Sequence, residues 1–286
     1  MKVAIQSLTT YPLKSAAGIA LSTAKLSITG LPSDRRWMLV DDKNRFVSQR
    51  QLPEMALMTI SEDESGIEVS YTNQSPLRVT EPPAGAETFR ATMHRNYDTL
   101  EVVSAGNEAA EWFTRCFEHT EIGPLRLVRL RDDFQRAIPD RPEAPNQHVL
   151  LSDGYPFLIA SESSLSHLNE RLNRESGSQI QMNRFRPNIV ISGSQAWEEM
   201  ESGLALENEP GTIRFRLVKP CQRCSIPQMD PATGQTDFGP EFHRVLKEID
   251  NAREQPLNCF GHNAVLEQGD GESLAVGQPL QLKCVE

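Results

Sequence analysis

The apolar residues of this chain come in short runs, and residues that favour turns separate one run from the next. Within the first 71 residues the runs are Val3–Ile5, Leu26–Ile28, Trp37–Val40, Leu57–Ile60 and Ile67–Tyr71. The separating residues include Gly30, Pro32, Asn44, Pro53 and Gly66. Runs this short and this closely spaced leave no room for helices between parallel strands, so they favour an antiparallel barrel or sandwich. The sequence therefore predicts a mainly β fold.

Three segments instead carry apolar residues at helical spacing. The stripes are Ala109, Trp112, Phe113, Cys116 and Phe117; Leu165, Leu168 and Leu172; and Phe242, Val245, Leu246 and Ile249. Ser161 suits the N-cap of the second helix, and Pro240 suits the first turn of the third. Because a helix with one apolar face packs that face on a core, we interpret the stripes as core faces. The predicted fold class is mainly β (α+β), with a few peripheral helices.

A stretch rich in Arg and Pro follows the first predicted helix. Its arginines are Arg126, Arg129, Arg131, Arg136 and Arg141. Since 286 residues suit two intimate domains, we place the boundary here, with one domain at 1–130 and the second at 131–286. The basic stretch is either a solvated linker or a joint between the domains that faces an anion.

The whole chain is acidic, with a formal net charge of -10. This charge argues against nucleic acid and against an anionic membrane as partners, because both need a basic surface. Gln6, Ser7 and Lys14 interrupt any apolar signal core near the start, and no apolar run reaches transmembrane length. The five cysteines are an odd and sparse set, unlike a disulfide framework. We expect a reduced, cytoplasmic protein.

Cys221 and Cys224 form a Cys-x-x-Cys pair that has several interpretations. Half of a zinc site needs two more ligands, for which the candidates are His243, Cys259, His262 and Cys284. A thioredoxin-like redox pair would need a βαβ context, which is missing here. One cysteine could instead be the ligand of a soft transition metal, or both could be buried thiols without a role. Spacing alone leaves these four interpretations open.

Four other motifs place cations and turns where a ligand could bind. They are Tyr11–Ser15, Asp34–Trp37, Ser152–Pro156 and Arg184–Asn188. Lysine and arginine after a strand suit phosphate, and the planar guanidinium can bind phosphate or ring acceptors with two parallel hydrogen bonds. Each motif alone is typical of surface ion pairs or structural turns.

Taken in this order, the motifs resemble the MOSC family, the C-terminal domain of molybdenum cofactor sulfurase, preceded by its N-terminal β-barrel domain. Within that family the chain is most similar to the mitochondrial amidoxime reducing component and its bacterial relatives. The resemblance extends to Asp230–Gly234 and covers nearly the whole chain. It implies an N-terminal β-barrel domain packed on a MOSC β-barrel.

The resemblance also implies a molybdenum-molybdopterin cofactor and a set of residues around it. Cys224 would be the metal ligand and a catalytic residue, with Cys221 only a neighbour, and Asp153 would be a second catalytic residue. The cofactor-binding residues implied are Lys14, Ser15, Arg35, Ser152, Asp153, Gly154, Arg186 and Asn188. Lys219 and Arg223 flank the pair and would favour the thiolate that a metal needs.

The activity implied is the reduction of N-hydroxylated small molecules, from N–OH to N–H. The sequence has no plant-type Cys-x4-Cys-x2-Cys motif for an iron–sulfur cluster. We therefore expect electrons from a separate protein, ferredoxin-like or a flavin reductase. One alternative is a non-redox module that binds molybdopterin or carries sulfur on Cys224. Another is a pyridoxal phosphate protein with Lys14 as the imine-forming lysine, which nothing else in the sequence favours.

Overall fold

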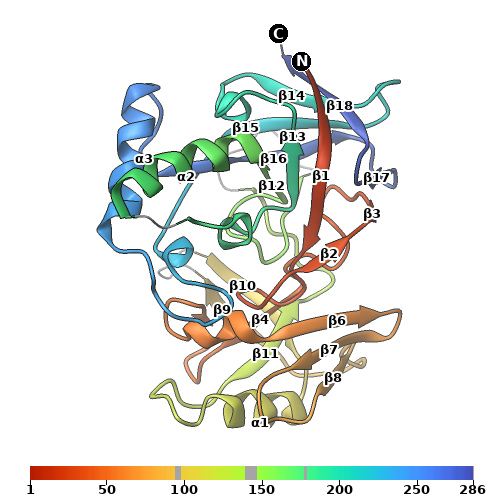
Figure 1. Ribbon diagram of the computed structural model, residues 1–286. Helices are drawn as coiled ribbons and strands as arrows, with labels where there is room; N and C mark the ends of the chain where they lie inside the picture. Colours follow the sequence, from red (N-terminus) through yellow and green to blue (C-terminus); the bar gives the residue numbers. More distant parts are fainter. Residues whose placement is uncertain (94–97, 139–146, 177–178, 286) are drawn as a thin grey trace.

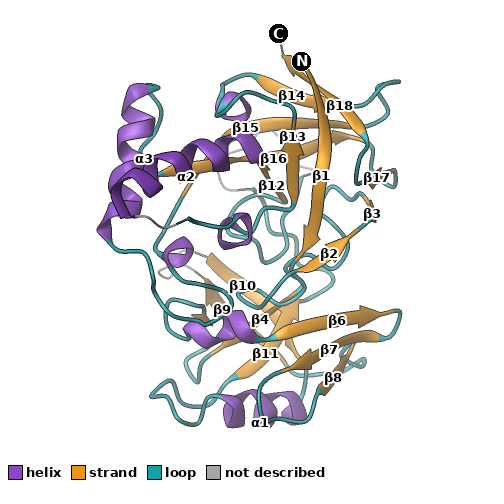
Figure 2. Ribbon diagram, viewed as in Figure 1, coloured by secondary structure: helices purple, strands orange, loops and turns teal. Residues whose placement is uncertain are grey.

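The computed structural model describes residues 1–93, 98–138, 147–176 and 179–285. Within these ranges the chain forms eighteen strands and three α-helices, and the strands dominate (Figure 2). The predicted mainly β fold is confirmed. No helix in the described ranges is both long and apolar enough to cross a membrane.

Seven strands form a closed barrel in the upper part of the molecule (Figure 1). Their order around the barrel is β13, β12, β16, β15, β14, β18 and β1, and β1 pairs with β13 to close the ring. All neighbours are antiparallel except β12 and β13. The bounds are β1 Lys2–Thr10, β12 Phe157–Ser161, β13 Ile189–Ser192, β14 Leu204–Glu207, β15 Arg214–Gln222, β16 Cys259–Gln268 and β18 Pro279–Cys284. Short β2 (Ile19–Leu21) pairs with β1, and β3 (Thr23–Lys25) with β17 (Ser273–Ala275).

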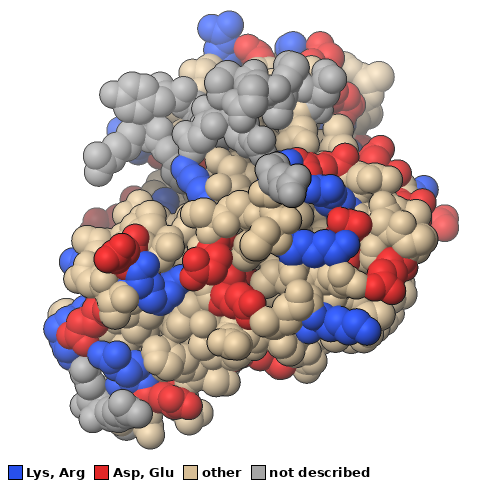
Figure 3. Space-filling view, turned by 90° about the horizontal axis from the view of Figure 1, so that it is seen from above, with Lys and Arg blue, Asp and Glu red and all other residues tan. Residues whose placement is uncertain are grey.

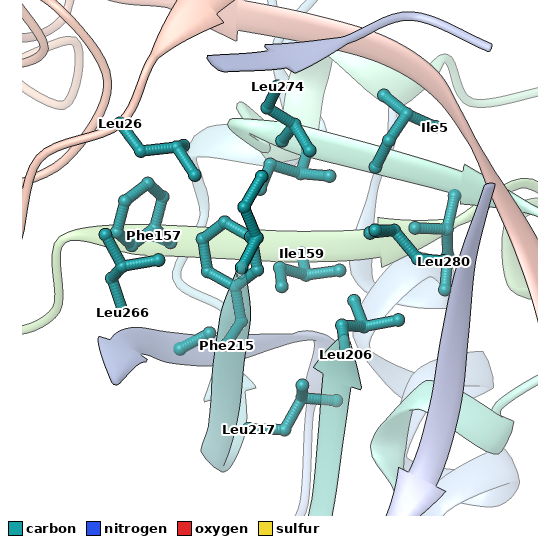
Figure 4. Packing of buried hydrophobic residues seen from close by; sticks show 14 of the residues in the cluster. Ile5, Leu26, Phe157, Ile159, Leu206, Phe215, Leu217, Leu266, Leu274 and Leu280 are labelled. Carbon is teal, nitrogen blue, oxygen red and sulfur yellow. The ribbon is translucent and has the colours of Figure 1, made fainter. Parts of the chain in front are cut away.

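The barrel interior is filled by apolar side chains from almost every strand. Ile5, Phe157, Phe215 and Leu280 come from four different strands and point toward one another (Figure 4). The rings of Phe157 and Phe215 meet edge to face, with centroids 5.1 Å apart. Because alternate residues of a strand point to opposite faces, each strand gives the interior one apolar row.

A second β unit occupies the lower part of the molecule (Figure 1). Its five-stranded sheet has the order β5, β4, β11, β10, β9, and a bridge between Arg45 and Thr92 links the two edges. The bounds are β4 Trp37–Val40, β5 Phe46–Val47, β9 Thr88–Met93, β10 Asp98–Ser104 and β11 Arg126–Leu130. The hairpin sheet β6 (Thr59–Asp63), β7 (Gly66–Ser70), β8 (Leu77–Thr80) and helix α1 (Asn107–Cys116) pack against it around a separate core.

Helices α2 (Glu162–Ser176) and α3 (Pro240–Ala252) lie on the outside of the barrel, as peripheral helices (Figure 1). Their apolar faces share a cluster with Phe185 and Phe260, whose rings stack at 3.8 Å. Four 3₁₀ turns connect other elements: η1 Pro53–Leu57, η2 Met182–Phe185, η3 Glu198–Met200 and η4 Ile226–Gln228.

Strand β1 is part of the seven-stranded barrel, although the other six barrel strands come from residues 157–284. β1 lies between β13 and β18, and the Met1 amine donates a hydrogen bond to the carbonyl of Leu282 (2.7 Å). Both chain ends therefore meet at the same edge (Figure 1). Past β1 the chain passes to the second unit, where Leu13 forms a bridge with Trp37. The division at residues 130 and 131 stays a prediction.

Charges of both signs are interspersed on the face of the barrel that carries the chain ends (Figure 3).

Candidate cofactor and active site

A cleft lies where the segment after β1, the loop before β12 and the end of β15 meet. It contains about 860 Å³ of space not filled by protein atoms, part of it open to solvent. The structure brings every site residue predicted from the sequence to its wall: Lys14, Ser15, Arg35, Ser152, Asp153, Gly154, Arg186, Asn188 and Cys224. Cys221, which we expected to be only a neighbour, lines the cleft as well. These residues come from five segments of the sequence.

The lining of the cleft is strongly cationic. Lys14, Arg35, Arg50, Arg186 and Arg223 contribute five positive side chains, against the single carboxylate of Asp153. In a chain of net charge -10, this reversal concentrates a positive potential that attracts anions.

Lys14 is buried, with 7% of its surface exposed. Its ammonium donates hydrogen bonds to the carbonyl of Leu151 (2.7 Å) and to Oδ1 of Asp153 (2.5 Å), and lies 5.0 Å from the ring centre of Phe46. Burial lowers the pKa of Lys14, and the charge of Asp153 partly offsets this. The next residue, Ser15, has a φ of 75°, a left-handed conformation that turns the chain sharply below the cleft.

Two arginines enclose the ring of Tyr11. The guanidinium carbons of Arg35 and Arg186 lie 4.3 Å and 4.2 Å from the ring centre. Arg35 is fixed by two 2.7 Å contacts to the carboxylate of Asp34, which is 2% exposed. Arg35 also donates to the carbonyl of Arg186 (3.0 Å). The Tyr11 ring therefore helps to fix the positions of both guanidinium groups.

The side chain of Arg186 is only partly satisfied within the described residues. One terminal nitrogen donates to the carbonyl of Ala16 (2.6 Å), and the other, Nη2, is buried with no hydrogen-bond partner among the described residues. Burial lowers the pKa of Arg186 to about 10. A buried donor left unpaired costs free energy, and an anionic ligand in the cleft would supply the missing partner.

Asn188 lies on the cleft wall, but its side chain is engaged within the protein. Its amide nitrogen donates to Oδ1 of Asp34 (3.0 Å) and to the carbonyl of Thr9 (3.3 Å), and its oxygen accepts from the Leu158 amide (3.1 Å). These bonds join β1, β12 and the turn that carries Arg35. Direct contact with a cofactor stays a prediction for this residue.

The two cysteines lie at and beyond the end of β15 and have different partners. Cys224 is exposed, and the nearest donor is Nη1 of Arg50, 3.8 Å from its sulfur. Arg223 donates to the sulfur of Cys221 (3.1 Å) and to the carbonyl of Phe185 (2.8 Å). Cys224 is therefore the more exposed of the two thiols that line the cleft.

Lys219, which we expected to favour the thiolate of Cys224, lies over the ring of Tyr155, 5.8 Å from the ring centre. Its effect on Cys224 stays a prediction. Since β15 extends to Gln222, Lys219 is still within the strand while Cys224 has already left it. Arg50, from the segment after β5, takes the place next to the thiol.

The described residues do not support the zinc interpretation of the cysteine pair. None of them form a group of three or more His, Cys, Asp and Glu side chains able to hold a metal. Two of the candidates are buried among apolar neighbours: burial raises the pKa of Cys259 to about 12 and lowers that of His262 to about 4.

Arg50 and Arg136 are contributors that the sequence did not single out for the site. Arg50 stands alone in its segment, and only its position next to Cys224 reveals it. Arg136 belongs to the basic stretch, but it is 5% exposed and donates to carbonyl groups of the loop at 150–153. Arg136 therefore fits neither interpretation of the basic stretch, since it is neither in a solvated linker nor free to face an anion. Arg141, from the same stretch, lies outside the described residues.

Comparison with known proteins identifies the two halves of the chain. Residues 2–120 match the MOSC N-terminal beta barrel domain, and residues 146–281 match the MOSC domain. The human mitochondrial amidoxime-reducing component 1 is 30% identical over 95% of this chain and 80% of its own length. The chain belongs to the MOSC family. Because the domain order is the one expected, the resemblance noted in the sequence is confirmed.

Two further relatives show the range of proteins that this MOSC protein resembles. The mouse mitochondrial amidoxime-reducing component 1 is 29% identical over 95% of this chain and 80% of its own length. The molybdenum cofactor sulfurase of Solanum lycopersicum is 28% identical over 81% of this chain, a match that spans 29% of the sulfurase. The chain is thus similar both to amidoxime-reducing components and to part of a molybdenum cofactor sulfurase.

The cleft fits a group that carries both a soft metal and a phosphate. It offers one exposed thiol, the ligand type that soft metals prefer, and a buried arginine nitrogen that lacks an acceptor. A Cβ added at Gly154 would meet no atom within 4 Å, so this segment leaves the cleft open. The donor set thus matches a metal-bearing, anionic cofactor.

Proposed function

We propose that this MOSC protein is a molybdenum-dependent oxidoreductase that reduces N-hydroxylated compounds with electrons from a separate protein. The observation that carries the proposal is the meeting of an exposed thiol, Cys224, with the unpaired buried nitrogen of Arg186 in one cationic cleft. The similarity to amidoxime-reducing components supports the choice of substrate.

Each residue of the cleft has a separate task in this proposal. The Cys224 thiolate binds the metal, and Arg50 at 3.8 Å favours its negative charge. Lys14, Arg35 and Arg186 bind the phosphate and the polar edge of the pterin, which Tyr11 keeps aligned. Ser152 and Gly154 line the opposite wall. The bound cofactor supplies the two electrons.

Asp153 is the residue that we assign to the substrate. Its side chain is 74% exposed at the mouth of the cleft and is held by Lys14. It is the one carboxylate among the lining residues, so it can accept hydrogen bonds from the N–H and O–H groups of an amidoxime. In the overall reaction the N–O bond breaks, two electrons and two protons are consumed, and water leaves. An exposed carboxylate is suited to relay these protons from solvent.

We place the protein in a reducing compartment, the cytoplasm, because all five cysteines are free. The electron donor is proposed to be ferredoxin-like or a flavin reductase. It would approach the open side of the cleft.

The test is the molybdenum and pterin content of protein produced in a host that makes molybdopterin. We expect both near one per polypeptide, with Cys224→Ala losing molybdenum and Cys221→Ala retaining it as the matched control. Turnover of a simple aromatic amidoxime with an artificial reductant then tests the reaction. Zinc without pterin would refute the proposal. Cofactor without turnover would favour a non-redox carrier instead.

A further inference from the structure

Arg136 is a buried cation that the proposed chemistry does not use. Its guanidinium donates to the carbonyl oxygens of Leu150 (3.0 Å), Ser152 (2.6 Å) and Asp153 (3.1 Å). Its own carbonyl accepts from the amide of Val149 (2.9 Å). The loop at residues 149–153 is therefore wrapped around one side chain, which the sequence places in a different segment.

The same loop contacts two cations of the cleft. The carbonyl of Leu151 accepts from the Lys14 ammonium (2.7 Å), and the amide of Leu151 donates to the carbonyl of Arg35 (3.0 Å). Asp153 makes a second contact with Lys14 at 2.5 Å. The carbonyl that binds Lys14 thus lies between carbonyls that bind Arg136, so displacing the loop from Arg136 also displaces it from Lys14.

Arginine is suited to this task for a geometric reason. Its planar guanidinium presents five donors in a fixed fork, whereas a lysine ammonium presents three donors around one point. Three carbonyls at hydrogen-bond distance from one side chain require the spread of the fork. A lysine at position 136 would keep the charge but could not reach all three.

We propose that Arg136 is the positioning residue of this cleft: by holding residues 150–153 it places Lys14 and Arg35 for a phosphate-bearing ligand. The identity of that ligand as the molybdenum cofactor rests on the proposed function. The placement of Lys14 by Arg136 rests only on the contacts above.

The test compares Arg136→Lys with Arg129→Lys. Arg129 is a matched control because it is also buried, at 6% exposure, and pairs with Asp132 and Glu81 away from the cleft. In cofactor-free protein we expect acetic anhydride to modify Lys14 about tenfold faster in Arg136→Lys, the fold-change that one charged hydrogen bond represents. Hydrogen exchange at residues 149–153 should rise in parallel. In the cofactor-loaded protein, pterin release should accelerate by a similar factor.

Arg129→Lys should leave the rate of Lys14 modification, the hydrogen exchange at residues 149–153 and the rate of pterin release unchanged, even if its melting temperature falls. Equal effects of the two substitutions, or an unchanged Lys14 reactivity in Arg136→Lys, would overturn the positioning role. If Arg136→Lys does not fold, hydrogen exchange in the wild-type protein tests the proposal instead. The amides of Val149 and Leu151 must then be protected from exchange in the absence of cofactor. Rapid exchange there would refute the proposal. A wild-type protein without pterin would refute the proposed function alone, since the Lys14 and exchange measurements need no cofactor.

Discussion

Replacing Arg186 with Met separates cofactor binding from folding. Nη2 of Arg186 is buried with no partner among the described residues, and burial lowers the pKa of this guanidinium to about 10. The difference from the ordinary value of 12.5 corresponds to about 3 kcal/mol against the buried cation. Met removes the cost of burying this charge and fills a volume similar to that of Arg.

The substitution also removes favourable contacts. The hydrogen bond to Ala16 is worth about 2 kcal/mol, and the contact with the Tyr11 ring about 1 kcal/mol. These losses nearly equal the gain, so the free energy of unfolding of the cofactor-free protein should change by less than about 1 kcal/mol. Binding of a phosphate-bearing cofactor should weaken by about 1.5–3 kcal/mol, the range for a hydrogen bond to a charged group.

The assay is urea unfolding of protein from a host that makes no molybdopterin, together with pterin content after expression in a host that does. Arg184→Met is the matched control, two residues away. Arg184 is buried and forms a paired contact with Asp237 at 2.5 and 2.7 Å. The carboxylate of Asp237 is 44% exposed, so breaking this pair should cost about 1–3 kcal/mol. If Arg186→Met is destabilised as much as Arg184→Met and still keeps its pterin, Arg186 is a structural residue and our reasoning is wrong.

The cofactor site and the buried Glu199 give three other testable expectations. Cys224→Ala should lose molybdenum but keep part of its pterin, while Cys221→Ala keeps both; equal metal loss would refute a single thiolate ligand. Burial lowers the pKa of Lys14 below its ordinary value of 10.5, so its charge is lost, and pterin release should accelerate, at a lower pH than for an exposed lysine. Asp153→Asn, which removes the stabilising charge, should shift this rise to lower pH, and a release rate independent of pH would contradict the assignment. Burial raises the pKa of Glu199 from 4.5 to about 7, so the folded state holds a proton that the unfolded state loses. Stability should therefore fall by about 3 kcal/mol from pH 4.5 to 7, and urea midpoints of Glu199→Gln should lack this slope.

Local sequence patterns predicted where the strands lie better than they predicted which strands pair with each other. The runs at residues 37–40 and 67–71 match β4 and β7 closely. The run Leu26–Ile28 does not continue β3, because Ser27 and Gly30 close a turn there. Leu57–Ile60 is divided, since η1 ends at Leu57 and β6 begins at Thr59. Alternation says which face of a strand is buried, but not that β1 pairs with strands near the other end of the chain.

The prediction of the candidate site was limited in the same way, because local sequence does not show which distant segments meet. Lys14, Arg35 and Cys224 could be proposed from the sequence because each lies in a motif with other informative residues. Arg50 and Arg136 could not, since their roles depend on where distant segments meet. A lone arginine in a polar segment reads as a surface residue until the fold brings it to a thiol or a loop.

The closure of the barrel by β1 also determines when the protein can become functional. β1 is synthesised before its neighbours β13 and β18, which lie at Ile189–Ser192 and Pro279–Cys284. The strand must wait for most of the chain before it finds either partner, and such distant pairings form slowly. Lys14, just after β1, cannot reach its place beside the loop at 150–153 before that. A partly synthesised chain therefore has no finished cleft, and cofactor insertion has to follow translation rather than accompany it.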